Sequence, residues 1–289
     1  MVLNFVFLLT SIFFPKPDTL IFENSFGNFQ NAVSISTARE EFIFVCDTRA
    51  NQVIKFSAKG EQLTSIGGAG FGQNELNRPE GIDASSGLDV YVCDYQNNRI
   101  QKYDLNLSYI TTFDFNNYNV TALNSDKIFF PASIAFLSTS EIFVLADASQ
   151  YRMVKLKSFD EVNLLFCSGN LGVDKLYNPT KIARGSNLDI YILDKYTNDV
   201  INFDNYGTYV RRLDNPDSAK IVSISYYGDE LYILKDKYLV TYDLKAQRYS
   251  NLYFINPFEK VTFVDITVLK KSKILILTTN KVMSFNINQ

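Results

Sequence analysis

A short unit recurs along most of the chain, and its repetition constrains the fold more than any other feature. The unit combines an apolar run, a polar turn and a second run, as in VCDTRANQVIKF from Val45 and VCDYQNNRIQKY from Val92. Six copies align, and their closing residues are Phe56, Tyr103, Leu156, Phe203, Tyr242 and Phe285. The successive spacings of these residues are 47, 53, 47, 39 and 43. Such a period is typical of β-propellers.

Each unit also has an opening strand before the apolar run and a fourth strand at its end. The expected blades cover about 29–66, 77–113, 130–168, 177–213, 219–254 and 260–289. The last blade has only three strands of its own, and the isolated strand at 19–26 can supply the fourth. Such closure removes two free sheet edges. The sequence therefore predicts one all-β domain over 19–289: a six-bladed β-propeller of four-stranded antiparallel blades, closed by an N-terminal strand joining the C-terminal blade.

An apolar run at residues 2–14 precedes the repeats. It is too short to span a bilayer, which takes roughly 20 residues. It fits the central region of a secretory signal, followed by a break at Pro15 to Asp18. No Lys or Arg precedes the run and no A-x-A site follows it, so a buried N-terminal strand is the alternative. We expect residues 1–18 to be a signal peptide and linker, and the protein to be exported to the periplasm or the extracellular space.

Composition excludes several classes of function. The chain has no histidine, the usual general base and nitrogen ligand for metals, so Ser/His/Asp triads, Cys/His pairs and His-ligated metals are excluded. A net charge of −3 does not favour binding to nucleic acid, which needs a clustered basic surface. The three cysteines are widely spaced, which argues against a disulfide framework or a zinc site. We expect no metal and no cofactor.

The best-preserved copy reads PEGI at 79–82, DVYVCD at 89–94 and NRIQKY at 98–103. This pattern resembles the NHL repeat, and the linking segment IGGAGFG at 66–72 is also typical of that family. The fifth and sixth units lose its Pro and Asp. The resemblance implies a propeller scaffold that carries many unrelated functions. Its histidine-dependent lyases and esterases cannot serve as a guide to catalysis here.

Four aspartates recur at the end of the second strand: Asp47, Asp94, Asp147 and Asp194. A ring of calcium ligands is one interpretation. The other is that each carboxylate accepts backbone N–H groups of the following turn, as in Asx-turns. Equivalent positions in different blades are spread around a ring, so we expect the structural role. Cys46 and Cys93 stand just before two of these aspartates and are expected to be buried between blades.

Residues that enter the first strand of each blade should surround the mouth of the central channel. The set contains the uncharged residues Gln30, Asn31, Ala132 and Thr180. Its charged members are the candidate binding residues Arg78, Glu80, Lys181, Lys220, Glu259 and Lys260. Their mixed charges suit an anionic or zwitterionic ligand, such as a peptide end or a carbohydrate. No catalytic residue and no metal ligand is assigned.

Two functions remain open at this point. The first is a non-enzymatic, exported NHL-like propeller that binds a protein, peptide or carbohydrate ligand at the channel rim. The second is a calcium-dependent lactonase- or lyase-type enzyme with carboxylates converging in the channel, for which Glu80 and Glu259 are the visible candidates. We expect a monomer that neither binds nucleic acid nor inserts stably into a membrane.

Overall fold

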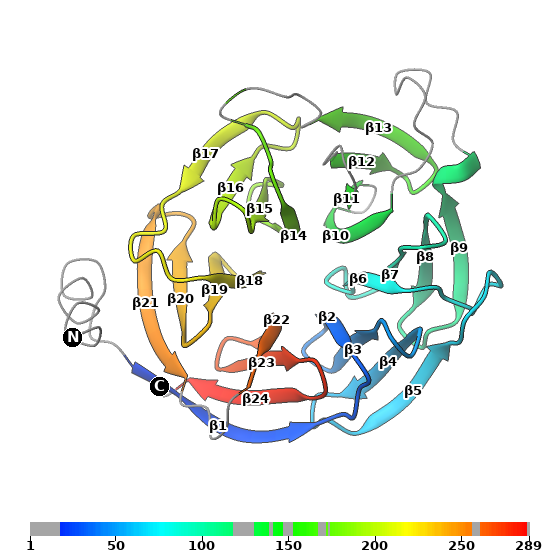
Figure 1. Ribbon diagram of the computed structural model, residues 1–289, viewed down its shortest axis with the longest axis horizontal. Helices are drawn as coiled ribbons and strands as arrows, with labels where there is room; N and C mark the ends of the chain where they lie inside the picture. The colour runs from blue at the N-terminus through cyan, green and yellow to red at the C-terminus, as the bar shows by residue number, and fades with distance from the viewer. Residues whose placement is uncertain are drawn as a thin grey trace.

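The computed structural model describes residues 18–117, 130–138, 141–146, 153–166, 172, 174–255 and 261–287. Within these residues, strands are arranged as six four-stranded blades around a common axis (Figure 1). The first blade contains β2 (Ala32–Ala38), β3 (Phe42–Asp47), β4 (Gln52–Ser57) and β5 (Gln62–Gly67). The second contains β6 (Pro79–Asp83), β7 (Asp89–Asp94), β8 (Arg99–Asp104) and β9 (Tyr109–Asp114), followed by the short helix η1 (Phe115–Asn117).

The remaining blades repeat this order. The third contains β10 (Pro131–Ser138), β11 (Glu141–Ala146), β12 (Met153–Lys157) and β13 (Glu161–Phe166). The fourth contains β14 (Pro179–Arg184), β15 (Ile190–Asp194), β16 (Asp199–Phe203) and β17 (Tyr209–Leu213). The fifth contains β18 (Ile221–Tyr227), β19 (Glu230–Lys235), β20 (Tyr238–Asp243) and β21 (Arg248–Ile255). The sixth contains β22 (Phe263–Lys270), β23 (Lys273–Thr278) and β24 (Val282–Ile287).

The strand β1 (Asp18–Phe26) completes the sixth blade, where it pairs antiparallel with β24 as the outermost strand (Figure 1). The predicted fold class, including this closure, is confirmed. The structure adds a second pairing: Asp18 to Leu20 run parallel to Tyr253 to Ile255 of β21. Blades five and six therefore form one continuous eight-stranded sheet.

Hydrophobic packing between blades holds the ring together. The described residues form six buried clusters, one at each interface between neighbouring blades. The cluster between the last and first blades joins Leu275 and Leu277 to Ile43 and Val45. Second strands supply the largest share of this core, because β-branched and aromatic side chains on both faces of such a strand pack against neighbouring sheets. The ring is thus closed by apolar packing as well as by β1.

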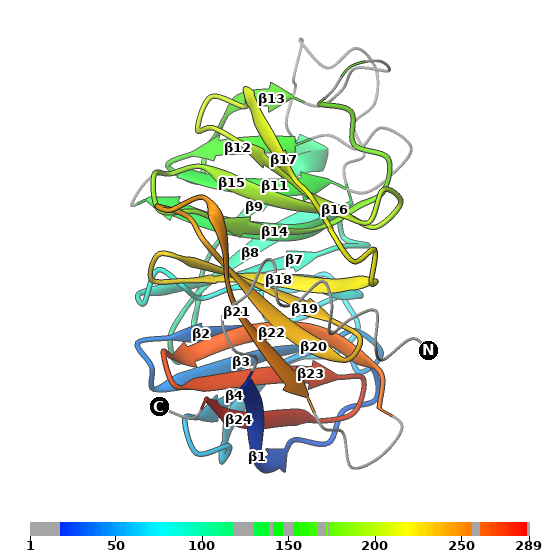
Figure 2. The same cartoon turned by 90° about the vertical axis from the view of Figure 1, so that its left-hand side faces the viewer.

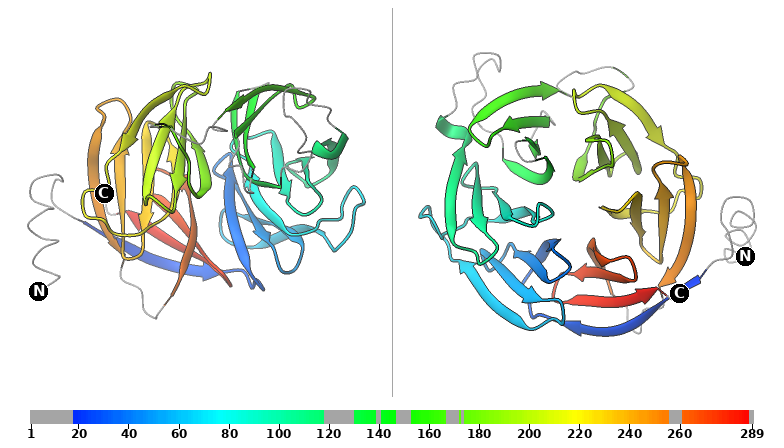
Figure 3. Two further views of the ribbon diagram at one scale, coloured as in Figure 1. Left: turned by 45° about the horizontal axis from the view of Figure 1, so that its top comes forward. Right: turned by 180° about the vertical axis from the view of Figure 1, so that it is seen from behind.

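The turns lie on two opposite faces of the disc, as the side view shows (Figure 2). We call the upper face the one that carries the segments entering each first strand and the turns between second and third strands. The lower face carries the turns between first and second strands. First strands line the axis, and outer strands form the rim, as both views of Figure 3 show. The described segments contain no helix with the length and hydropathy that a bilayer crossing requires.

Candidate functional site

The aspartates at the ends of the second strands hold the turns of the upper face in place through hydrogen bonds. Asp47 accepts backbone N–H groups from Gln30 (2.7 Å) and Asn31 (2.9 Å), and also from Ala50 in the following turn (3.2 Å). Asp194 accepts equivalent bonds from residues on both sides. Sequence reasoning anticipated only the bonds to the following turn. The same carboxylate also fixes the segment that enters the first strand of its blade. Asp147 lies outside the described residues.

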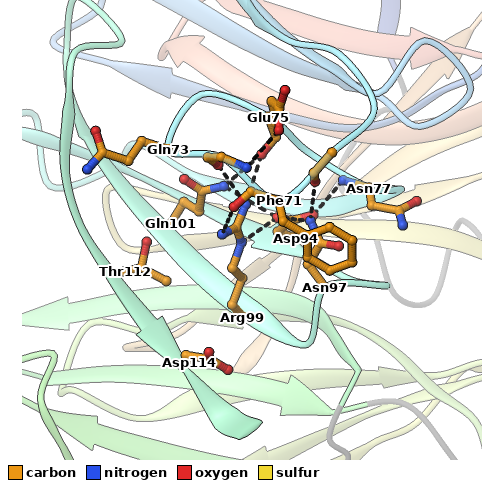
Figure 4. A network of polar contacts seen from close by, with 12 residues as sticks. Phe71, Gln73, Glu75, Asn77, Asp94, Asn97, Arg99, Gln101, Thr112 and Asp114 are labelled. Carbon is orange, nitrogen blue, oxygen red and sulfur yellow. Dashed lines mark hydrogen bonds and ion pairs between the residues drawn. The ribbon is translucent and has the colours of Figure 1, made fainter. Parts of the chain in front are cut away.

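Asp94 is the centre of the largest network on this face (Figure 4). Its fully buried carboxylate accepts hydrogen bonds from the backbone of Asn77 (2.7 Å) and from the side chains of Asn97 (2.8 Å) and Arg99 (2.7 Å). The Arg99 guanidinium also donates to three backbone carbonyls, those of Phe71, Gly72 and Glu75. These bonds hold the glycine-rich link between the first and second blades.

Replacing Arg99 with methionine should release this link. We expect a fall of about 1–3 kcal/mol in the free energy of unfolding, because several acceptors lose a charged donor. Backbone amides of residues 68–76 should exchange faster in hydrogen-exchange mass spectrometry. Arg248→Met, at an exposed arginine, is the matched control and should change stability by less than about 0.5 kcal/mol. Unchanged exchange in residues 68–76 would contradict the assigned role.

A ring of equivalent side chains lies deeper in the channel. In every blade, the pairing between the first and second strands is interrupted by a register shift just after the first residue of the first strand. The residue that resumes the pairing is structurally equivalent in all six blades. These positions are Ser34, Gly81, Ser133, Lys181, Ser223 and Asp265. A Cβ on Gly81 would lie only 2.8 Å from the Ala132 carbonyl oxygen, which shows how closely the blades approach here.

The ring contains one ion pair, between Lys181 and Asp265. The Lys181 Nζ lies 2.5 Å from Oδ2 of Asp265, whose side chain is 2% exposed. Asp265 also accepts hydrogen bonds from the Ser223 hydroxyl (2.5 Å) and the Ile35 backbone N–H (3.0 Å). The carboxylate is therefore saturated by groups from three other blades.

Two cavities meet at this ion pair. The upper one has a volume of about 310 Å³ and is lined by Arg78, Glu80, Thr180, Lys181 and Lys195, among others. The lower one has a volume of about 290 Å³, and Lys181 lines it as well. We call the upper cavity the upper mouth. The Lys181–Asp265 pair forms its floor.

The cations of the upper mouth are not all balanced. Arg78 binds Glu80 at 2.7 Å, and Lys181 binds Asp265. Within the part of the chain that the structure describes, neither Lys195 nor the exposed Lys220 makes an ion pair. The buried Thr180 hydroxyl likewise lacks a hydrogen-bond partner among those residues. The arrangement leaves uncompensated positive charge at the mouth.

The surroundings of Lys195 perturb its titration. Desolvation by the channel wall lowers the pKa of this ammonium below the usual 10.5, although the side chain remains accessible from the mouth. Asp265 opposes the shift, whereas the neighbouring cations Lys220 and Lys181 add to it. An anion bound at the mouth would offset the repulsion between these lysines and stabilise the charged form of Lys195.

The structure brings together some of the residues selected from the sequence. Arg78, Glu80, Ala132, Thr180 and Lys181 line the upper mouth. Lys220 lies outside the cavity wall but close enough to affect the pKa of Lys195. Glu259 and Lys260 lie outside the described residues. Gln30 and Asn31 do not line the cavity.

Sequence reasoning missed two members of the site, Asp265 and Lys195. The signal for Asp265 was an acidic residue inside an otherwise apolar first strand, which is unusual for a buried position. The signal for Lys195 was its place directly after Asp194, where the second blade has Tyr95. The observed register aligns Lys181 with Gly81, so Glu80 corresponds to Thr180.

The cysteines near the channel are buried and lie between blades. Cys46 and Cys93 are both 0% exposed, and burial raises the pKa of each thiol well above its usual value. Protonated, inaccessible thiols are inert, which fits a packing role. Cys167 lies outside the described residues. Among the residues that are described, no group of three or more His, Cys, Asp or Glu side chains is placed to hold a metal ion.

Known proteins resemble this chain in fold. A family model for a "6-bladed beta-propeller" matches residues 28–164. No curated protein matches the sequence. A solved structure of streptogramin B lyase is 12% identical, with a TM-score of 0.62 over 92% of this chain and 97% of that one.

Virginiamycin B lyase from Staphylococcus aureus is similar to the same degree. A catalytically inactive histidine-to-alanine variant with quinupristin is 12% identical, with a TM-score of 0.60 over 89% of this chain and 80% of that one. The selenomethionine-substituted enzyme is 11% identical over the same shares, with a TM-score of 0.59. At these identities the similarity shows the propeller fold alone.

Proposed function

We propose that this chain is a non-enzymatic binding module whose upper mouth takes an anionic group of a ligand. The observation that carries the proposal is a pair of lysines, Lys195 in the wall of the upper mouth and Lys220 close to it. Neither has an acidic partner within 4 Å among the described residues. An incoming carboxylate would supply one. Lys195 stays accessible from the mouth, so an incoming anion can reach it.

A calcium-dependent enzyme is the weaker alternative. Calcium takes six to eight oxygen ligands. Asp265 is the buried carboxylate at the floor of the upper mouth, and its oxygens already bind Lys181, Ser223 and Ile35. An ammonium group 2.5 Å from the carboxylate also repels a cation. These contacts favour an anion over a metal at the mouth.

A lyase activity like that of the similar structures is also disfavoured. Virginiamycin B lyase is catalytically inactive in the variant in which a histidine is replaced by alanine. This chain contains no histidine to take that role. Within the mouth, Lys195 is the group whose pKa moves toward neutrality. A single perturbed lysine supports binding better than it supports a catalytic set.

Calorimetry with two small probes tests the anion site. N-acetylglutamate should bind, whereas its neutral analogue N-acetylglutamine should bind far more weakly. The Lys195→Met/Lys220→Met variant should lose about tenfold in affinity, which corresponds to roughly 0.7 kcal/mol for each ion pair. Lys59→Met/Lys270→Met, at two exposed lysines outside the mouth, is the matched control. Equal binding of the two probes would overturn the proposal.

Anion affinity should depend on pH through Lys195. The charged ammonium binds the anion, so affinity is retained below its pKa and falls as the pH rises through it. Because desolvation lowers this pKa, the fall should begin at a lower pH than expected for an ordinary lysine with a pKa of 10.5. In the Lys195→Met variant, the fall in affinity at this lower pH should be absent. A wild-type profile that falls only near pH 10.5 would show that Lys195 does not bind the anion.

We also propose that the protein is exported and that its repeats are NHL-like. The apolar run at 2–14 supports export, and the motif at 79–103 supports the NHL relationship. Mass spectrometry of the protein expressed in bacteria would test export. Mature protein that retains residues 1–18 and stays in the cytoplasm would contradict it.

A further inference from the structure

Two aromatic stacks lie on the upper face beside the mouth. Tyr177 and Tyr196 have ring centroids 5.2 Å apart and planes inclined by 22°. Tyr95 and Phe130 show nearly the same geometry, 5.2 Å and 23°. The first stack is the more accessible, because Tyr196 is 74% exposed and Tyr177 is 41% exposed.

The orientation of the Tyr177–Tyr196 stack is fixed by buried groups. Both backbone N–H groups donate to the same carboxylate, that of Asp194, which is 0% exposed. The Lys175 ammonium lies 4.5 Å from the Tyr177 ring centroid. With one ring face against Tyr177, Tyr196 presents its other face to solvent. The backbone of both stacked residues is therefore held in place by Asp194 before any ligand arrives.

Lys195 lies between Asp194 and Tyr196 in the chain and lines the upper mouth. An unpaired cation and an open aromatic face are thus contributed by consecutive residues. A ligand that uses both must carry a negative charge next to a flat surface of C–H groups. A hexuronate ring has both features, because its carboxylate projects from a ring whose C–H groups can pack on the electron-rich face of tyrosine.

A peptide strand fits this face less well. Peptides that add to a sheet need unpaired backbone groups along a strand edge. On the channel side, the N–H of Ile35 donates to Asp265 and the N–H of Ile182 donates to Ser133 of the neighbouring blade. The N–H of Phe136 likewise donates to Asp83. These inner edges are already satisfied by side chains.

We propose that the ligand is an acidic oligosaccharide, with a hexuronate ring on the open face of Tyr196 and its carboxylate on Lys195. This inference rests on the proposed anion site and names the class of ligand that the site takes.

Calorimetry with three tetramers tests the inference: tetragalacturonate, maltotetraose as the neutral sugar, and tetraglutamate as the acidic peptide. Tetragalacturonate should bind most tightly. Tyr196→Ala should weaken its binding about tenfold, in line with the energy of a ring stacked on an aromatic side chain. Tyr196→Phe keeps the ring and should bind as the wild type does. Tyr206→Ala is the matched control, because Tyr206 is 78% exposed and its N–H also donates to a turn aspartate.

The outcomes distinguish failure of the sugar inference from failure of the anion site on which it rests. If tetraglutamate binds and tetragalacturonate does not, or if Tyr196→Ala binds tetragalacturonate normally, the sugar inference is wrong and the anion site stands. If maltotetraose binds as tightly as tetragalacturonate, the carboxylate contact with Lys195 is wrong. If none of the tetramers and no N-acetylglutamate binds, both proposals fail.

Discussion

Replacing Asp265 with alanine should lower the free energy of unfolding by roughly 3–5 kcal/mol, the cost of removing one partner from a buried ion pair. The Lys181 ammonium, with a side chain only 19% exposed, would remain at the floor of the mouth without its counter-ion. The Ser223 hydroxyl and the Ile35 N–H would also lose their acceptor. Because these groups come from blades one, four and five, the loss should loosen the ring around the whole axis.

Urea denaturation of three variants checks this expectation. The double variant Lys181→Met/Asp265→Leu removes both charges, so it should recover most of the stability that Asp265→Ala loses. Asp236→Ala, at an exposed aspartate, should change stability by less than about 0.5 kcal/mol. A loss below about 1 kcal/mol for Asp265→Ala would show that the pair contributes little to the ring.

Replacing Leu20 with alanine should cost about 2–5 kcal/mol, the range for truncating a buried leucine. Leu20 is 3% exposed and packs in the cluster between blades five and six. Its strand β1 pairs with β21 and β24, and Phe26 packs against Phe56 of the first blade. The closing strand therefore touches three blades, and a cavity beneath it weakens the closure directly.

The neighbouring residue provides the control. Ile21 is 47% exposed, so Ile21→Ala should change stability by no more than about 0.5 kcal/mol. A chain that lacks residues 1–26 should expose the edge of β24 and associate through it, which size-exclusion chromatography would detect. Equal stability losses for Leu20→Ala and Ile21→Ala, or a monomeric truncated chain of normal stability, would contradict this role of β1.

The fold could be predicted from the sequence because each repeat encodes one blade. The apolar runs recur in all six units, and the turn Asp recurs in the first four, so strands and turns can be located from local patterns. Asn51, Asn98 and Asn198 all adopt positive φ values of 54–57° in equivalent turns, a conformation that asparagine tolerates better than most residues. The parallel pairing of β1 with β21 could not be predicted, because it depends on where the ends of two distant strands meet in space.

The site was harder to predict because it depends on differences between the repeats. The Lys181–Asp265 pair joins residues 84 positions apart in sequence, and only the bulge in each first strand places them in one ring. An error of one residue in aligning the repeats would place Lys181 with Glu80 in place of Gly81. In a strand, such a slip moves a side chain to the opposite face. Lys195 was missed because its turn resembled the structural turns of the other blades.

A crystal structure of the protein with its tightest-binding anionic probe would test the central claim most directly. The proposal predicts a carboxylate of the probe within about 3 Å of the Lys195 Nζ, the usual length of a charge-assisted hydrogen bond. It also predicts that the Lys181–Asp265 pair remains intact beneath the ligand. A probe bound in the lower cavity or at the outer rim, with no ligand at the upper mouth, would contradict the account.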